Sequence, residues 1–153
     1  MNAVHKLGLL VCVLSCCFTG CGGPASGRLK TATVTGRVTF KGEPLSLGEI
    51  KFLPDGATGE GVRVAYSTLD ENGRYSLTTY GNGDGAILGS HRVTIVSREE
   101  VTPGMGKRMT PQGMAPAQQP KSFIPERYAK PETSGLTAEV KSGSNEINFD
   151  LQE

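Results

Sequence analysis

Apolar and polar residues alternate in short runs along most of this chain, and turn signals separate the runs. The first run, TVTGRVTF at 33–40, places Val34, Val38 and Phe40 on one face, and Gly36 marks a bulge or a close approach of another segment. Six more runs follow at 47–54, 62–69, 74–80, 90–97, 135–140 and 145–151. Because none of them has a helical period, the pattern predicts an all-β domain.

Turn residues indicate how the predicted strands are connected. KGEPL at 41–45 turns the chain after the first strand. Asn72-Gly73 predicts a tight hairpin turn, because both residues tolerate positive φ. Tyr75 and Leu77 then alternate inward together with Thr79.

The number and spacing of these runs predict a seven-stranded antiparallel Greek-key β-sandwich over residues 33–153. The last two strands flank SGSN at 142–145, and Val93 and Ile95 share one face of the strand at 90–97. Between them, residues 98–121 are rich in proline and predict a mobile loop. Phe123, Ile124 and Tyr128 follow this loop, and we expect them to anchor it to the domain.

The first 20 residues have a different composition from the rest of the chain. Lys6 precedes an apolar stretch from Leu7 to Phe18, and this order is typical of a secretory signal peptide at 1–20. The apolar stretch is too short to cross a bilayer core of roughly 30 Å as a helix. All 4 cysteines lie within residues 1–21, so the domain has no disulfide and no thiolate metal site.

FTGC at 18–21 resembles the lipobox of bacterial lipoproteins. The resemblance implies that a signal peptidase cleaves before Cys21, which then carries a diacylglycerol and an N-acyl chain such as palmitate. One acyl chain binds a membrane reversibly, whereas two or more hold it firmly. Gly22, where an aspartate would favour the inner membrane, favours the outer membrane. VLSC, which ends at Cys16, is a rival lipobox, and the chain could also be secreted without a lipid or not be exported.

The predicted mature chain starts with a tether and has no net charge. Residues 21–32 are rich in glycine and small residues without periodicity, which predicts a flexible tether. Cleavage would remove one of the 16 basic residues, Lys6, and leave 15 basic side chains against 15 acidic ones. A balanced charge gives no electrostatic basis for binding nucleic acid.

Four strings cover most of the predicted domain: VTGRVTFKGEPLSLGEIKFLP, DENGRYSL, GDGAILGSHRVTIV and IPERYAKPETSGLTAEVKSGSNEINFDL. Together they resemble small lipoproteins of planctomycete-type bacteria that carry a carboxypeptidase regulatory-like domain. The resemblance spans Val34 to Leu151 and implies a transthyretin-like, or prealbumin-like, sandwich. We therefore expect a non-catalytic structural or interaction module without a cofactor, anchored at the periplasmic face or in the outer membrane. Its expected partners are the membrane, reached through Cys21, and an envelope protein or glycan.

Oxygen-bearing side chains gather in two of the predicted loops. Asp70, Glu71 and Asn72 lie in one loop and Asp84 in another, and Ca²⁺ takes six to eight oxygen ligands. These residues lack the spacing of an EF-hand. Turn formation is therefore the better interpretation of them.

His91 is the histidine that remains after removal of residues 1–20, and it lies within a predicted strand. A lone histidine lacks the partners that a metal site or a catalytic triad needs. The transthyretin-like sandwich also occurs in hydroxyisourate hydrolases, which share several histidines, an arginine and a C-terminal YRGS. This chain ends in INFDLQE instead. A transthyretin-like hydrolase is therefore the remote alternative.

Tyr66, Tyr75, Tyr80 and Tyr128 are the candidates for an aromatic platform that binds sugars. Alternation places Tyr75 in the core, and the chain has no tryptophan. An envelope glycan- or peptide-binding module is the main alternative to a structural role.

Overall fold

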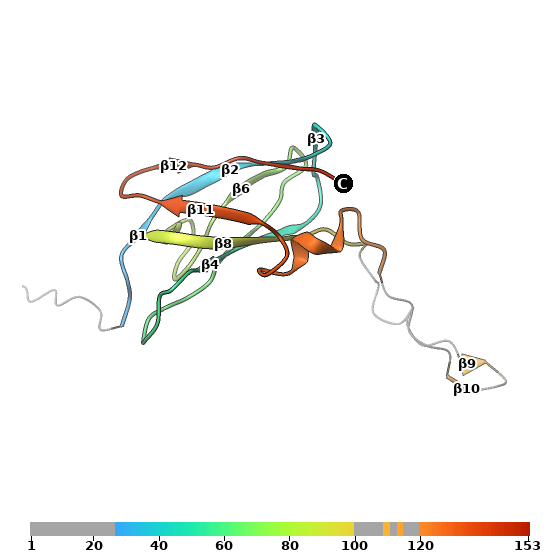
Figure 1. Ribbon diagram of the computed structural model, residues 1–153, viewed down its shortest axis with the longest axis horizontal. Coiled ribbons are helices and arrows are strands. Elements are labelled where there is room, and N and C mark those ends of the chain that lie inside the picture. The colour runs from blue at the N-terminus through green and yellow to red at the C-terminus, as the bar shows by residue number, and fades with distance from the viewer. Residues whose placement is uncertain (1–26, 100–108, 111–112, 115–119) are drawn as a thin grey trace, which may run out of the picture.

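The computed structural model describes residues 27–99, 109–110, 113–114 and 120–153. In these residues the chain forms short strands and one 3₁₀ helix, η1, at Glu126–Ala129 (Figure 1). The all-β prediction is confirmed for this part of the chain. The strands are β1 Thr31–Ala32, β2 Val34–Phe40, β3 Glu43–Pro44, β4 Glu49–Pro54, β5 Ala65–Thr68, β6 Arg74–Ser76, β7 Ala86–Ile87, β8 Gly89–Val96, β9 Met109–Thr110, β10 Gly113–Met114, β11 Leu136–Val140, β12 Asn145–Glu146 and β13 Phe149–Leu151.

One sheet consists of four antiparallel strands in the order β11–β8–β4–β5. Ile50 and Phe52 of β4 and Val93 and Ile95 of β8 are buried on its inner face, as the alternation predicts. The same alternation continues to His91, which is 1% exposed.

The second sheet is built around β2, which is paired along both edges. On one edge β2 pairs antiparallel with β3 and β6, and on the other it pairs parallel with β12 and β13. The prediction that all strands are antiparallel is therefore wrong for the C-terminal strands. The reason is that β11 pairs with β8 in the first sheet, so the chain changes sheets after Val140 and returns beside β2 in the same direction.

A tight turn with two residues in the left-handed backbone conformation lies at Lys41 and Gly42, whose φ angles are 55° and 84°. It joins β2 to β3 as a two-residue hairpin loop. A tight turn forms at the predicted Asn72-Gly73, where the Gly73 N–H donates to the Asp70 carbonyl at 2.9 Å. Only Gly73 has a positive φ there, of 71°, so the turn differs in type from that at Lys41-Gly42.

The strand that follows this turn does not form the expected regular hairpin. β6 pairs with β2. The segments on either side of the turn are joined by the Asp70 N–H, which donates to the Arg74 carbonyl at 2.9 Å, and by an isolated bridge between Tyr66 and Thr78. Tyr75 and Leu77 are buried as predicted, whereas Thr79 is only partly buried.

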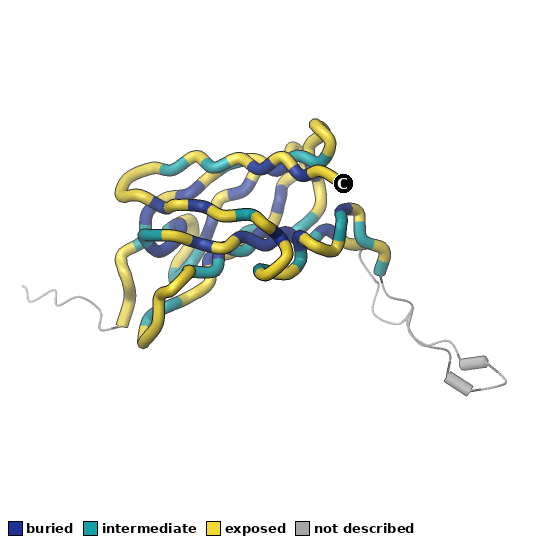
Figure 2. Tube along the Cα trace, viewed as in Figure 1, coloured by how far each residue is buried: buried dark blue, intermediate teal, exposed yellow. Residues whose placement is uncertain are grey.

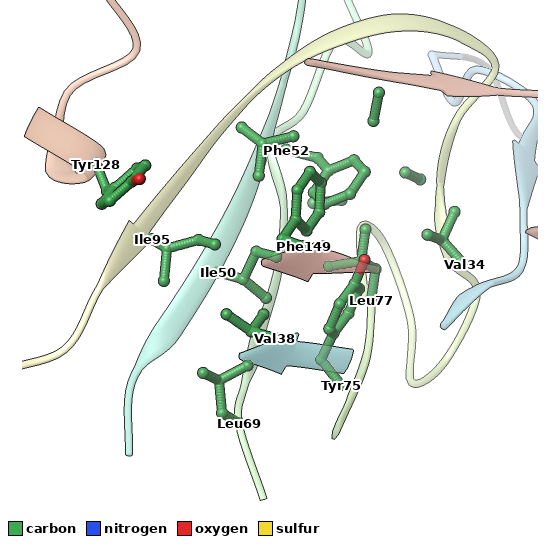
Figure 3. Packing of buried hydrophobic residues seen from close by; sticks show 14 of the residues in the cluster. Val34, Val38, Ile50, Phe52, Leu69, Tyr75, Leu77, Ile95, Tyr128 and Phe149 are labelled. Atoms are coloured by element: carbon green, nitrogen blue, oxygen red, sulfur yellow. The ribbon is translucent and has the colours of Figure 1, made fainter. Parts of the chain in front are cut away.

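The two sheets face each other across one hydrophobic core, and Figure 2 shows where along the strands the buried residues lie. Phe52 of β4 lies at its centre, with ring centroids 6.1 Å from Phe149 of β13 and 6.3 Å from Tyr75 of β6 (Figure 3). Because Phe149 and Tyr75 belong to the other sheet, these aromatic contacts hold the two sheets together.

The segment after residue 121 attaches to the domain through two of its three predicted anchors. Ile124 and Tyr128 are buried, but Phe123 is 46% exposed. The Phe123 N–H donates to the Ser97 carbonyl at 2.9 Å, so its backbone is fixed to the end of the first sheet although its side chain is not buried.

The domain begins before residue 33. The Leu29 N–H donates to the Tyr80 hydroxyl at 3.1 Å, the Lys30 carbonyl accepts from Leu88 at 3.2 Å, and β1 pairs with β7. Residues 29–32, part of the predicted tether, therefore belong to the domain.

Several predictions fall on residues outside the described ranges. They are the signal peptide at 1–20, Cys21 with the start of the tether, and the mobility of most of the segment 98–121, within which β9 and β10 pair antiparallel. No helix in the described ranges is long and apolar enough to span a membrane.

Candidate functional site

The parallel ladder beside β2 is interrupted between β12 and β13. The Ile147 N–H donates to the Thr35 carbonyl at 2.9 Å, and in a regular parallel ladder the Ile147 carbonyl would next accept from Arg37. Instead, the Arg37 N–H donates to Asn148 Oδ1 at 2.7 Å, and the Ile147 carbonyl accepts from the Tyr75 hydroxyl at 2.6 Å. Two side chains thus replace one bond of the ladder.

Gly36 allows this exchange of partners. A Cβ at this position would lie 1.8 Å from the Ile147 carbonyl oxygen and 2.9 Å from the Tyr75 hydroxyl, so no side chain fits. Of the two alternatives predicted at Gly36, a bulge or a close approach, the structure shows the close approach. Burial raises the pKa of Tyr75, so its hydroxyl keeps its proton and remains a donor at neutral pH.

A shallow hollow of about 700 Å³ lies over this interruption, on the outer face of the sheet. Three neighbouring segments line it, and Figure 1 shows β12, β2 and β6 beside one another. Its polar side chains are Thr35, Arg37 and Thr39 of β2, Arg74 of β6, and Glu146, Asn148 and Asp150 of the C-terminal segment.

Arg37 and Arg74 lie directly opposite each other in β2 and β6. The Val38 N–H donates to the Gly73 carbonyl at 2.8 Å, so the adjacent arginine pair is a non-hydrogen-bonded pair, in which cross-strand side chains come closest. Neither guanidinium is in an ion pair with a described residue. Like charges in this position destabilise a sheet.

The carboxylates of the hollow are bound by neutral groups instead of arginines. Asp150 accepts from Thr39 Oγ1 at 2.7 Å and from Gln152 Nε2 at 2.8 Å, and Glu146 accepts from Asn148 Nδ2 at 3.3 Å. Positive charge therefore gathers on the β2 and β6 side of the hollow and negative charge on the C-terminal side.

Two of the four residues considered for Ca²⁺, Asp70 and Asp84, act as acceptors within two separate turns. Asp70 Oδ1 accepts from the N–H groups of Asn72 at 2.8 Å and Arg74 at 2.7 Å. The Asp84 carboxylate accepts from three successive N–H groups at 79–81, at 2.7, 3.0 and 3.1 Å. Within the described ranges, no group of three or more His, Cys, Asp or Glu side chains is placed to hold one metal ion.

His91 is a core residue on the inner face of β8. Its Nδ1 lies 3.0 Å from the Gly89 carbonyl, its ring lies 5.8 Å from that of Phe52, and its buried Nε2 has no partner among the described residues. Burial lowers the pKa of His91 and outweighs the opposing effects of the Gly89 hydrogen bond and the charge of Glu139. The imidazole is therefore neutral and inaccessible to a substrate at neutral pH.

The four tyrosines do not form one platform. Tyr75 and Tyr128 are buried, the Tyr80 hydroxyl donates to the Gly61 carbonyl, and Tyr66 is 50% exposed. The aromatic platform considered for sugar binding is therefore not assembled from these residues.

Arg37 and Arg74 are the candidate residues that the sequence analysis missed. Alternation in the run at 33–40 places Arg37 on the outer face, so its exposure could be predicted from the sequence. Its position opposite Arg74 could not be predicted, because it depends on the pairing of β6 with β2 instead of with β5.

The comparisons with known proteins leave the family open. No family model matches the chain, and no curated protein matches it. Among solved structures, a 9R-lipoxygenase from Cyanothece PCC8801 matches with a TM-score of 0.38 and 12% sequence identity, over 81% of this chain and 16% of that protein. The chain thus spans a small part of that enzyme, and a similarity of this size carries no argument about activity.

Proposed function

We propose that this protein is an exported lipoprotein of the bacterial cell envelope that acts as a non-catalytic structural or interaction module. Its anchor is the acylated Cys21, at the periplasmic face or in the outer membrane. The observation that carries this proposal is the order of the N-terminal segments: a signal-peptide-like stretch at 1–20, the FTGC string, and a short spacer before the domain.

The arrangement of the strands supports a transthyretin-like, seven-stranded Greek-key sandwich as the finer description of the domain. Each of the seven predicted runs contains a strand of one of the two main sheets, and their inner faces share one core. The last run contains two of these strands, β12 and β13. β3 pairs with β2, and β1 and β7 pair with each other; each of these three strands has two residues.

The roles of the reactive side chains support a non-catalytic domain. His91 lies in the core, the Tyr75 hydroxyl holds the Ile147 carbonyl, and the carboxylates of Asp70 and Asp84 hold turns. Each of these groups is engaged in a structural contact that a substrate would have to break, which disfavours a transthyretin-like hydrolase.

The position of β1 indicates how an anchored domain would be presented. In Figure 1, β1 lies at one end of the domain and β3 and η1 lie at the other. An anchor at Cys21 would therefore hold the β1 end towards the membrane and leave the outer face of the β2 sheet open to large envelope molecules.

The test is fractionation of cells that produce the Cys21→Ser variant or that are treated with globomycin, which inhibits the lipoprotein signal peptidase. We expect both treatments to block maturation, and the Cys21→Ser protein to lose its firm attachment to membranes. The matched control is Cys16→Ser, which changes the rival lipobox and should mature normally. The proposal fails if the Cys21→Ser protein still partitions fully with membranes, or if Cys16→Ser is the variant that blocks maturation.

The second candidate function is binding of an envelope glycan or peptide. The hollow over β2 favours it, because this hollow combines carboxylate, amide and hydroxyl groups with two arginines that form no ion pair with a described residue.

A further inference from the structure

We propose that the hollow over β2 binds a carboxylated sugar, whose carboxylate lies between Arg37 and Arg74 and whose hydroxyl groups face the C-terminal segment. This inference rests on the binding role proposed above and names its site and ligand class. It does not depend on the lipid anchor, since Cys21 contributes nothing to the hollow.

The need for an anion follows from the arginine pair. Arg37 and Arg74 lie opposite each other at a non-hydrogen-bonded position, and no described acidic residue forms an ion pair with either. An anion that bridges both guanidinium groups would remove their repulsion and gain charge-assisted hydrogen bonds. Guanidinium groups bind carboxylates in a planar, bidentate geometry.

The other side of the hollow argues against a ligand that is anionic throughout. Glu146 and Asp150 lie there, and both are bound by neutral donors. An extended polyanion would bring negative charge against these carboxylates. Hydroxyl groups would instead donate to them, and Asn148 offers an amide beside them. A ring that carries one carboxylate and several hydroxyls matches this arrangement.

The position of the hollow also favours a sugar over an extended peptide. A peptide bound by strand addition needs a free sheet edge with unpaired backbone groups. At the hollow, β2 is paired with β6 on one edge and with the C-terminal strands on the other. The ladder bond that is missing is already replaced by Tyr75 and Asn148. Recognition is therefore left to side chains on the face of the sheet.

The size of the hollow suits a small ring compound. Its volume of about 700 Å³ lies within the usual range of small-molecule sites, although it is shallow and open. Because an open site buries little of its ligand, we expect a single sugar unit to bind with an affinity in the millimolar range.

The test uses the chain from residue 21 to 153 with Cys21→Ser, so that no lipid is attached, and records nitrogen–proton NMR spectra that include the arginine Nε–H signals. The probe is methyl β-D-glucuronide, and its neutral counterpart is methyl β-D-glucoside, which differs only at the carboxylate. We expect the glucuronide to shift the signals of Arg37 and Arg74 with saturation, and the glucoside to bind at least tenfold more weakly.

Variants assign the effect to the hollow. Arg37→Gln and Arg74→Gln should each weaken glucuronide binding at least tenfold. The melting temperature of each variant without sugar should stay equal or rise, because the repulsion between the two arginines is gone. Arg63→Gln, at an exposed arginine outside the hollow, removes the same charge and should bind as the parent does.

Three results would overturn the proposal. The first is the absence of saturable shifts at Arg37 and Arg74 with the glucuronide. The second is equal binding of the glucoside, which would make the arginines irrelevant. The third is binding of inorganic phosphate or an acidic tripeptide at the same two signals as tightly as the glucuronide, which would show a general anion site or a peptide site. Membrane attachment through Cys21 would remain unaffected by all three.

Discussion

The Tyr75 hydroxyl donates to the Ile147 carbonyl across 2.6 Å, in the space that Gly36 leaves free in β2. This contact joins a buried ring from the core to the segment between β12 and β13. Because the Ile147 carbonyl accepts from Tyr75, the Arg37 N–H donates to Asn148 Oδ1 instead. The shape of the hollow on the outer face therefore depends on the hydrogen bond that the buried Tyr75 donates to Ile147.

Gly36→Ala should destabilise the domain by about 1–3 kcal/mol, because the new Cβ overlaps the Ile147 carbonyl and the segment after β12 must shift. Urea unfolding followed by circular dichroism measures the difference. The matched control is Gly81→Ala, where a Cβ meets no atom within 4 Å, and it should change the free energy of unfolding by less than about 0.5 kcal/mol. Equal stability of the two variants would contradict the close approach at Gly36.

Tyr75→Phe removes a hydroxyl and leaves the Ile147 carbonyl without its donor. We expect a loss of about 1–3 kcal/mol in the free energy of unfolding, measured by urea titration. Tyr66→Phe removes the same atom from a side chain that is 50% exposed and should have an effect below about 0.5 kcal/mol. If Tyr75→Phe were as stable as Tyr66→Phe, the hydroxyl would have no structural role.

Asp84→Ala should cost about 1–3 kcal/mol in stability, because three backbone N–H groups at 79–81 lose their charged acceptor. Asp55→Ala, which breaks the exposed ion pair with Arg92, should cost at most about 1 kcal/mol. The melting temperature of the unsubstituted domain should be the same in EDTA and in Ca²⁺, since the Asp84 carboxylate is already occupied. A rise in melting temperature with Ca²⁺ that Asp84→Ala abolishes would reverse this interpretation.

Stability should fall as the pH is lowered from about 6.5, the ordinary pKa of histidine. Burial lowers the pKa of His91 in the folded state, so the unfolded chain binds a proton first and protonation favours unfolding. The contribution is fully present above pH 6.5 and declines towards the folded-state pKa, with a slope of at most about 1.4 kcal/mol per pH unit.

The measurement is the free energy of unfolding of the parent and of His91→Leu between pH 5 and 8, roughly the range in which histidine titrates. The difference between the two proteins isolates His91, because the carboxylates titrate alike in both. The variant should lack the decline, and above pH 7 it should be at least as stable, because it also removes the buried Nε2, which has no partner among the described residues. Parallel pH profiles would contradict a neutral His91 in the core.

The sequence by itself predicted the strand positions and the inward residues. Alternation identified Val34, Val38, Ile50 and Phe52 as core positions, and all four are buried. This succeeded because the side-chain period of a strand is a local property of the backbone. It also marked Gly36 as a bulge or a place of close approach, although it did not identify the segment that approaches it.

The tertiary structure decided which strands are neighbours. It paired β6 with β2, brought the last segment beside β2 in parallel, and formed the two-residue hairpin loop at Lys41-Gly42. The arginine pair of the hollow follows from the first of these pairings. Strand partners far apart in the sequence are chosen by how the whole core packs, and a local pattern does not contain that information. The N-terminal FTGC string is the opposite case. Its four adjacent residues alone predict that the protein is anchored to a membrane.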